Sequence, residues 1–404
     1  MKPIKKILYV SSLCSPQTLV DIFKISKIKP PLAIQKFHRL LVEGFSFQSE
    51  FCSIESLGAI PVTPASHKKR IWILPAEVVG KIKYTYVPLI NVPVIKNTGV
   101  FLYSFFKVVF WGLGGGTKDK IVVCDILALS ITAATLLACK VIRIKTVAIV
   151  TDMPHLMVDN LRQSRLVRKL FNRLVVMFMC SYDGYILLTE QMNECVNIQN
   201  KPYIVMEGLV DTNMVGTSNV LEKKNTKKIL LYAGGIHEKY GILTLIEAFM
   251  RLRANDIRLH IYGPGPMAKK MPRYMELDQR IVYYGTVLNK EVVEKELEAT
   301  LLINPRPSTE ELTLYSFPSK NMEYMVSGTP LLTTPLPGMP DEYKQYVYLF
   351  YDESTEGMHQ ILRTILAKSD EVLHEFGNRA KQFVLMYKSN DIQARRILCF
   401  LEKI

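Results

Sequence analysis

The sequence has few of the residue patterns that mark metal sites or disulfide-bonded folds. Its seven cysteines are scattered without a C-x-x-C pair, and its seven histidines include no H-E-x-x-H spacing. Because the cysteines lie mostly in apolar runs, we expect reduced, buried thiols in a cytosolic protein. We also expect no structural metal and no tightly bound cofactor.

Long uninterrupted apolar runs are also missing. Residues 121–139 approach the roughly 20 residues that a membrane span needs, but Asp125 interrupts them. We therefore predict a buried parallel strand ending at Asp125 and a helix over 127–140. The apolar run after Lys5 and Lys6 is short, which favours a first strand over a signal peptide.

The sequence contains no low-complexity tract and no short-period repeat. Of its 404 residues, 49% are hydrophobic and 22% are charged, which is typical of a folded globular chain. A chain of this length is expected to form two or three domains.

Acidic residues are scarce in the first half. Through residue 210 there are 26 Lys and Arg against 13 Asp and Glu, whereas the remainder has 25 against 24, so the first half carries +13 of the total +14. Residues 160–180 place four of these cations at helical spacing, beside a stripe of Leu and Phe. The four are Arg162, Arg165, Lys169 and Arg173.

A basic amphipathic helix of this kind often lies on anionic lipid, and residues 100–111 add a dense aromatic and apolar run. We expect an anionic membrane surface as a partner. The alternative is a solvated basic face over a core stripe, together with a buried helix. Nucleic acid is not expected, because no motif for binding it is present.

The most informative segment is 304–343, which follows a short apolar run at 301–304. It predicts a strand at 301–304, a helix from about 320 to 327 with Ser319 as its N-cap, a left-handed Gly328, and a strand at 329–334. Glu323 is placed in the first helical turn, close to free backbone N–H groups. Those groups can bind a phosphate while the carboxylate binds sugar hydroxyls, a combination that suits a nucleotide-sugar. The alternative is a capping Glu on an ordinary surface helix.

Two glycine turns follow predicted strands in the same half. Gly234 and Gly235 end a strand at 229–233 and precede a helix with apolar residues at helical spacing, and Gly263 ends a strand at 259–262. Such turns present N–H groups to a diphosphate at the carboxyl edge of a parallel sheet. Without a ligand they are ordinary strand-ending turns. The repeated strand–helix alternation predicts an α/β fold with doubly wound parallel sheets.

Residues 317–332, FPSKNMEYMVSGTPLL, resemble the donor-site signature of the family-4 retaining glycosyltransferases, of the bacterial surface-polysaccharide type. The resemblance implies a GT-B fold, in which two Rossmann-like doubly wound domains enclose a cleft. Glu323 matches the glutamate that binds the donor ribose in that family, and Gly328, Thr329 and Pro330 match its G-x-P turn.

The match departs from the family pattern at two positions. Tyr315 stands where the family often has an earlier Glu near the transferred sugar, and Glu310 or Glu311 are candidates to substitute for it. Gly235 stands where the family usually has an Arg facing the diphosphate. The nearest cation is Lys239, shifted by one from the usual Lys position, with Lys320 as a second candidate.

The resemblance implies a donor site and a set of catalytic residues. The donor-binding residues would be Gly234, Gly235, Gly263, Tyr315, Ser316, Phe317, Pro318, Ser319 and Glu323. Lys239 and Lys320 would neutralise the departing diphosphate. In the first half, a predicted strand at 147–151 ends next to Asp152 and His155, and the family commonly places a His or Asp at such a strand end.

The expected organisation is an acceptor-side domain over 1–208, a donor domain over 209–385 and a C-terminal helix over 386–404 that returns to the first domain. The expected activity is retaining transfer of a sugar from a nucleotide diphosphate-sugar, with a UDP-sugar as first guess. The acceptor would be a hydroxyl of a lipid-linked saccharide, at the inner face of the cell membrane. The alternatives are a sugar-nucleotide epimerase of similar fold and a non-catalytic nucleotide-sugar-binding partner of another transferase.

Overall fold

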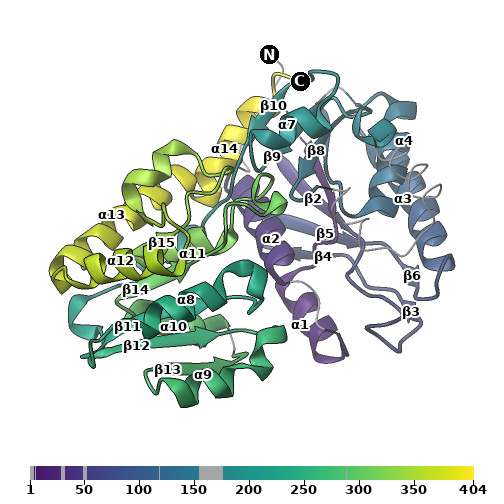
Figure 1. The fold of residues 1–404 in the computed structure, drawn as a ribbon. Coiled ribbons are helices and arrows are strands. Elements are labelled where there is room, and N and C mark those ends of the chain that lie inside the picture. Colours follow the sequence, from purple (N-terminus) through teal and green to yellow (C-terminus); the bar gives the residue numbers. More distant parts are fainter. Residues whose placement is uncertain are drawn as a thin grey trace. The chain divides into compact units, whose positions relative to one another are not determined.

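The computed structural model describes residues 4, 6–28, 32–48, 52–117, 119–153, 176–287 and 289–404. The chain forms two compact units (Figure 1). The first comprises Met1–Leu209 together with Asn390–Ile404, and the second comprises Val210–Ser389. The predicted basic stripe and His155 lie outside the described residues.

The first unit is built on an eight-stranded sheet with the order β10-β9-β8-β7-β1-β2-β5-β4. All neighbours pair in parallel except the edge pair β4 and β5. The strands are β1 (Lys6–Ser11), β2 (Ser53–Gly58), β4 (Glu77–Val79), β5 (Ile82–Tyr86), β7 (Lys120–Asp125), β8 (Lys145–Val150), β9 (Gly184–Leu187) and β10 (Tyr203–Val205). A separate antiparallel pair joins β3 (Ile71–Trp72) to β6 (Leu89–Ile90).

Six helices of the first unit matter for its packing. They are α1 (Pro16–Lys24), α2 (Leu32–Phe47), α3 (Ile95–Leu113), α4 (Leu129–Ile142), α7 (Gln191–Val196) and α14 (Asn390–Leu401). The C-terminal α14, yellow in Figure 1, lies against the purple α2. The Asn390 side-chain amide donates to the Leu40 carbonyl at 3.1 Å. A Cβ at Gly44 would lie 2.1 Å from the Asn390 carbonyl oxygen, so this close approach requires glycine.

The helix predicted over 127–140 begins two residues later, at Leu129. The reason is local, because the Asp125 carboxylate accepts from the Leu127 N–H at 3.1 Å and holds residues 126–128 in a turn. The strand predicted to end at Asp125 is β7.

The second unit contains a six-stranded, fully parallel sheet with the order β13-β12-β11-β14-β15-β16. The strands are β11 (Lys228–Ala233), β12 (Ile257–Tyr262), β13 (Ile281–Gly285), β14 (Leu301–Asn304), β15 (Leu331–Thr333) and β16 (Tyr348–Leu349). The helices are α8 (Ile242–Met250), α9 (Met271–Leu277), α10 (Asn289–Glu298), α11 (Ser319–Ser327), α12 (Thr355–Leu366) and α13 (Asp370–Lys388).

Helices cover both faces of this second sheet, and each face has its own apolar core. Leu230 of β11 joins the core with α8, α9 and α12, whereas the next residue, Leu231, joins the core with α11 and α13. This alternation follows from the two-residue period of a strand and explains why the strands read as continuous apolar runs. The α/β fold with doubly wound parallel sheets is confirmed.

Three expected features can be compared with the described part of the chain. No helix there is long and apolar enough to cross a bilayer. No cluster of three or more His, Cys, Asp or Glu is arranged there to hold a metal. Four cysteines are buried free thiols, but the expectation of burial is wrong for Cys195 and Cys399, which lie on exposed faces of α7 and α14.

Candidate functional site

Two glycine turns of the second unit meet at the carboxyl edge of its sheet. Gly234 follows β11 and donates its N–H to the Tyr262 carbonyl at 3.0 Å, and Ile236 donates to the Pro264 carbonyl at 2.8 Å. Gly263 has a φ of 126°, and a Cβ there would lie 1.9 Å from the Gly234 carbonyl oxygen. Only glycine permits this contact, so the loops after β11 and β12 are held together.

A third loop, which follows β14, packs against the start of α8. Gly241 has a φ of 75°, and a Cβ there would lie 1.9 Å from the Pro305 carbonyl oxygen. The loops after β11, β12 and β14 therefore converge at one edge of the sheet. In parallel α/β sheets this is the edge where ligands bind.

Tyr324 of α11 fixes this helix beside the first glycine turn. Its hydroxyl accepts from the Ala233 N–H at 2.8 Å and donates to the Ala233 carbonyl at 3.1 Å. Ala233 is the residue immediately before Gly234. Burial raises the pKa of Tyr324 well above its ordinary value, so the hydroxyl keeps its proton.

Two asparagines fix the same helix to the strand ends. The Asn304 amide donates to the Asn321 side-chain oxygen at 2.7 Å, and the Asn321 amide donates to the Thr333 hydroxyl at 3.4 Å. Because β14 ends at Asn304 and β15 at Thr333, α11 is tied to the carboxyl ends of three strands, β11, β14 and β15.

The predicted start of this helix is wrong by one residue. Pro318, with φ −63° and ψ 117°, is the N-cap residue, and its carbonyl accepts from the Asn321 N–H at 2.9 Å. Proline fixes φ and so sets the helix start, and Ser319 becomes the first helical residue. Glu323 is then the fifth residue and lies in the second turn, not the first. The left-handed Gly328, with φ 80°, is confirmed.

Glu323 and Lys320 form an ion pair across one turn of α11. The Lys320 Nζ lies 2.7 Å from a Glu323 carboxylate oxygen, with side-chain exposures of 33% and 23%. Burial lowers the pKa of Lys320, but the carboxylates of Glu323 and Glu296 outweigh it and raise the pKa. Lys320 is therefore a charged partner of Glu323, and only part of its charge is available to a diphosphate.

The other predicted donor residues differ in what they can contact. Phe317 is buried in the core against Tyr343, with 4.9 Å between ring centroids, and Pro318 is also buried. Tyr315 and Ser316 are half-buried in the loop before α11, and Ser319 is exposed. Phe317 therefore shapes the loop through packing.

Lys239 is exposed in the short 3-10 turn Glu238–Tyr240 that precedes α8, and its Nζ lies 5.6 Å from the centre of the Tyr240 ring. A cation that sequence reasoning missed lies on the same ring, because the Arg306 guanidinium is 4.6 Å from the centre of Tyr240. Arg306 lies two residues after β14, and its position in Asn-Pro-Arg-Pro at a strand end is the only signal that could have found it.

Arg306 also lies close to the first glycine turn. The Tyr232 hydroxyl donates to the Gly235 carbonyl at 2.7 Å. Burial raises the pKa of Tyr232, and the positive charge of Arg306 opposes that rise. The Tyr240 ring links the two, because a Cβ at Gly235 would lie 3.5 Å from this ring and Arg306 lies over it. A cation is therefore close to Gly235, where the resembling family carries an Arg in the turn itself.

The first-unit candidates are separate from this cluster in the chain. Asp152 lies two residues after β8 and is half-buried, and His155 falls outside the described residues. Of the candidates to replace the missing Glu, Glu311 is exposed and Glu310 half-buried. The loop that carries them is braced where the Ser308 N–H donates to Glu353 at 3.0 Å.

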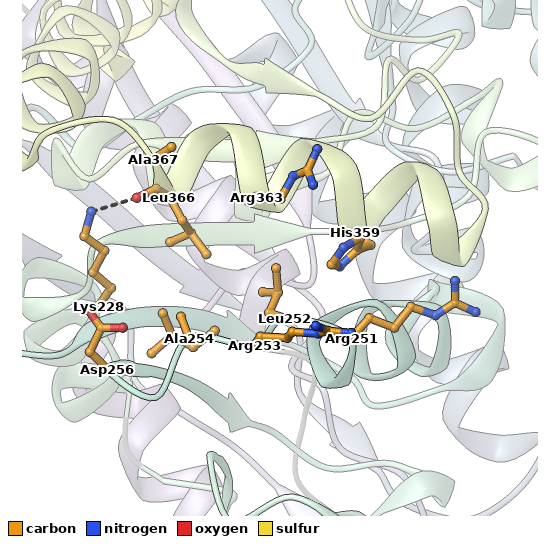
Figure 2. A pocket seen from close by; sticks show the side chains of 11 residues that line it. Lys228, Arg251, Leu252, Arg253, Ala254, Asp256, His359, Arg363, Leu366 and Ala367 are labelled. Atoms are coloured by element: carbon orange, nitrogen blue, oxygen red, sulfur yellow. Dashed lines mark hydrogen bonds between the residues drawn. The ribbon is translucent and has the colours of Figure 1, made fainter.

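A cavity of about 590 Å³ in the second unit lies at the edge of the sheet opposite to the glycine turns (Figure 2). Its lining includes Lys228 and Asp256, at the start of β11 and just before β12, so it lies at the amino edge of the sheet. A six-residue strand, roughly 20 Å, separates it from Gly234. Lys228 donates there to the Leu366 carbonyl at 2.9 Å, and Arg251 pairs with Glu356 at 2.8 Å. Lys228 therefore stabilises the end of α12, and Arg251 is already paired with a surface carboxylate.

A comparison with protein-family models finds a match within the second unit, which contains the glycine turns. Residues 227–368 match the family model described as "Glycosyl transferases group 1". No curated protein matches the sequence significantly.

Solved structures resemble the chain over nearly its whole length. Sucrose-phosphate synthase (tll1590) from Thermosynechococcus elongatus is 11% identical, with a TM-score of 0.64 over 99% of this chain and 98% of that one. Anabaena Alr3699/HepE in complex with UDP is 11% identical, with a TM-score of 0.63 over 99% and 100%. The lipopolysaccharide outer core galactosyltransferase WaaB is 14% identical, with a TM-score of 0.60 over 98% and 99%. The chain has the GT-B fold, and residues 227–368 of its second unit match the model of the group 1 glycosyl transferases.

Proposed function

We propose that the protein is a retaining glycosyltransferase that moves a sugar from a nucleotide diphosphate-sugar to a hydroxyl of a lipid-linked saccharide. The observation that carries this proposal is the double hydrogen bond of Tyr324 to Ala233. It holds the Glu323 helix beside the Gly234 turn, within a domain that matches the group 1 transferases. A UDP-sugar is the first candidate donor, because a structure of similar fold was solved with UDP and glucose.

The donor site divides into a carboxylate and a set of cations. Glu323 accepts hydrogen bonds from the ribose hydroxyls, and the N-terminus of α11 and the turn at Gly234, Gly235 and Gly263 face the diphosphate. Arg306 and Lys239 neutralise the charge that develops on the leaving diphosphate, with Lys320 in support. In this front-side reaction a diphosphate oxygen takes the acceptor proton, so catalysis depends on positioning. Asp152 and His155 are the acceptor-side candidates.

The competing function is a nucleotide-sugar-binding partner without activity of its own. Tyr315 and Gly235, which replace a Glu and an Arg of the family pattern, favour it. Arg306 restores a cation close to Gly235, which favours the transferase. The cellular role we propose is surface-polysaccharide assembly by a peripheral protein at the cytoplasmic face of an anionic membrane.

Nucleotide release from a panel of sugar donors, with and without a membrane extract, tests the proposal. A transferase releases nucleotide only when the extract supplies an acceptor, and labelled sugar moves to the lipid fraction. An epimerase converts or hydrolyses the donor without acceptor, and a binding partner does neither. Either of the last two results with the whole panel contradicts the proposal.

A further inference from the structure

One face of α3 is apolar and has no covering element in the described structure. Its inner residues Val100, Val108 and Gly112 are buried, and a Cβ at Gly112 would lie 2.1 Å from Ile142 at the end of α4. Figure 1 shows α3 and α4 side by side. The outer row has the helical spacing of a single face. It consists of Leu102, Phe106, Phe110 and Leu113, which are 53%, 54%, 71% and 61% exposed.

This outer face is larger than a scatter of single exposed residues. Tyr103 lies next to the row, and Leu137 and Val141 are also exposed on α4, the helix that packs against α3. Single exposed apolar residues are ordinary on protein surfaces, but contiguous patches mark interaction sites. The row extends over 12 residues of helix, from Leu102 to Leu113, and its ends are roughly 17 Å apart along the axis.

The charged side chains on the two helices have one sign. Neither α3 nor α4 contains an Asp or Glu, and Lys140 and Arg143 are exposed beside Val141. Lys107 lies within α3 itself, close to Phe106. The carbonyl end of α3, which would otherwise be negative, is neutralised by Lys120, whose Nζ contacts the Trp111, Gly112 and Gly114 carbonyls at 2.7, 2.9 and 2.6 Å.

An apolar face with basic neighbours could bind a second copy of the chain or a lipid surface, and its charge distinguishes the two. A second copy of the chain would bring lysines and arginines against one another, which is unfavourable. An anionic lipid surface attracts the cations and accepts the aromatic rings at its interface. A helix that lies in the plane of the interface meets these demands without crossing the bilayer.

We infer that the outer face of α3, with the exposed end of α4, is the surface by which the protein docks on an anionic membrane. The inference rests on the proposed function only for its purpose, which is to bring the enzyme to a lipid-linked acceptor. Docking itself is measured without any transfer reaction, so the failure of one proposal is distinguishable from the failure of the other.

The first experiment measures binding of the whole protein to phosphatidylcholine vesicles with and without phosphatidylglycerol. Phe106→Ser with Phe110→Ser is expected to weaken partitioning into anionic vesicles at least tenfold. Lys107→Gln with Lys140→Gln is expected to reduce its salt dependence. The control is Tyr351→Ser with Met386→Ser, which removes two residues of the second unit that are 80% and 61% exposed. Unchanged binding of the Phe variant, with an intact fold by circular dichroism, overturns the inference.

Tryptophan fluorescence provides a second readout on the unmodified protein. The sequence has two tryptophans, of which Trp72 is buried and Trp111 is half-buried on α3. Brominated anionic lipid is expected to quench the emission, and Trp111→Phe is expected to remove the quenching. Sedimentation that shows a dimer broken by the Phe variant, with no quenching of the wild type, assigns the face to a second copy and overturns lipid docking.

Discussion

At the scale of single residues, the contact that organises the donor site is the one between Tyr324 and Ala233. A single hydroxyl there satisfies both backbone groups of a buried strand end. Because burial raises the pKa of Tyr324, this contact does not titrate near neutral pH. This one oxygen atom therefore links the Glu323 helix directly to the glycine turn, beside the asparagine contacts that tie the helix to β14 and β15.

We predict that Tyr324→Phe lowers both the stability of the fold and the affinity for nucleotide. The ring keeps its packing, but the Ala233 N–H and carbonyl lose a partner, which costs about 1–3 kcal/mol of unfolding free energy. UDP affinity is expected to fall in parallel, because α11 is no longer held against β11. Chemical denaturation and calorimetry measure the two effects. A variant that loses stability but binds UDP as tightly as wild type would show that the contact does not position the site.

The second residue-scale prediction concerns Glu323. If its carboxylate binds the donor ribose, Glu323→Ala should weaken nucleotide binding by about 1.5–3 kcal/mol, roughly 10- to 150-fold, because charge-assisted hydrogen bonds are lost. Lys320→Ala is the matched control, since it breaks the same ion pair and leaves the carboxylate. Calorimetry with UDP and with uridine distinguishes the two. Equal losses in both variants would assign the effect to the ion pair.

Glu323 could be identified from the sequence because a helix start, a glycine and a strand surround it at fixed spacings. They could not reach Arg306. Its guanidinium lies over Tyr240, which is 66 residues earlier in the chain, so the pairing exists only after the loops after β11 and β14 have met. The cap at Ser319 was misplaced for a similar reason, because a preceding proline competes for the helix start.

At the scale of elements, Arg280 joins α8, the loop after α8 and the turn before β13. Arg280, just before β13, donates to the Leu252 and Ala254 carbonyls after α8 at 2.6 and 2.8 Å. It lies 5.0 Å from the Phe249 ring and pairs with Asp278 at 2.7 Å. The end of α8 is therefore stabilised by a cation that depends on a nearby carboxylate.

This arrangement predicts an acid-sensitive contribution to stability. Hydrogen bonds from Arg280 lower the pKa of Asp278 below its ordinary 3.8, against the opposing effect of burial. A lowered folded-state pKa stabilises the fold above the unfolded pKa, and this contribution is lost as the pH falls through the folded value. Asp278→Asn is expected to cost about 1–3 kcal/mol at pH 7, and the difference from wild type should vanish at low pH.

The measurement is urea unfolding of wild type and Asp278→Asn from pH 7 down to about pH 2, because the contribution is lost only below the unfolded pKa. The control is Asp341→Asn, which removes the carboxylate of a surface ion pair with Lys344 and should leave unfolding nearly unchanged. A difference for Asp278→Asn that is constant with pH would assign its effect to packing and not to the ion pair.

Most strands were predictable from apolar runs bounded by glycine or proline, whereas their ends were less so. The strand predicted over 329–334 is only Leu331–Thr333, because Thr329 is drawn into a buried network in which its hydroxyl contacts Glu296, Asn219 and Lys224. The run at 100–111 is helical, but its sequence does not reveal which residues face outward. That became clear only once α4 covered the other side.

At the scale of the whole molecule, the sequence divides its charge unevenly, and the division follows the two units. The second unit holds the converging glycine turns and the nearly neutral half of the chain, and the first holds the basic surplus and the apolar face of α3. We expect a corresponding division of labour. Donor binding should depend on second-unit residues, and acceptor chemistry and membrane contact on first-unit residues.

The last prediction tests this division through Asp152, which lies just after β8 at the carboxyl edge of the first sheet. A group that touches only the transferred sugar or the acceptor should matter for turnover and not for nucleotide affinity. Asp152→Asn is therefore expected to lower the transfer rate at least tenfold while the Kd for UDP barely changes, and His155→Ala is expected to do the same. Glu323→Ala should instead raise the Kd for UDP. Transfer near the wild-type rate in both first-unit variants would move the acceptor site elsewhere. The loop after β1, where Gln35 braces Ser12 and Cys14 with bonds of 2.7 and 3.0 Å, would then be the next segment to change.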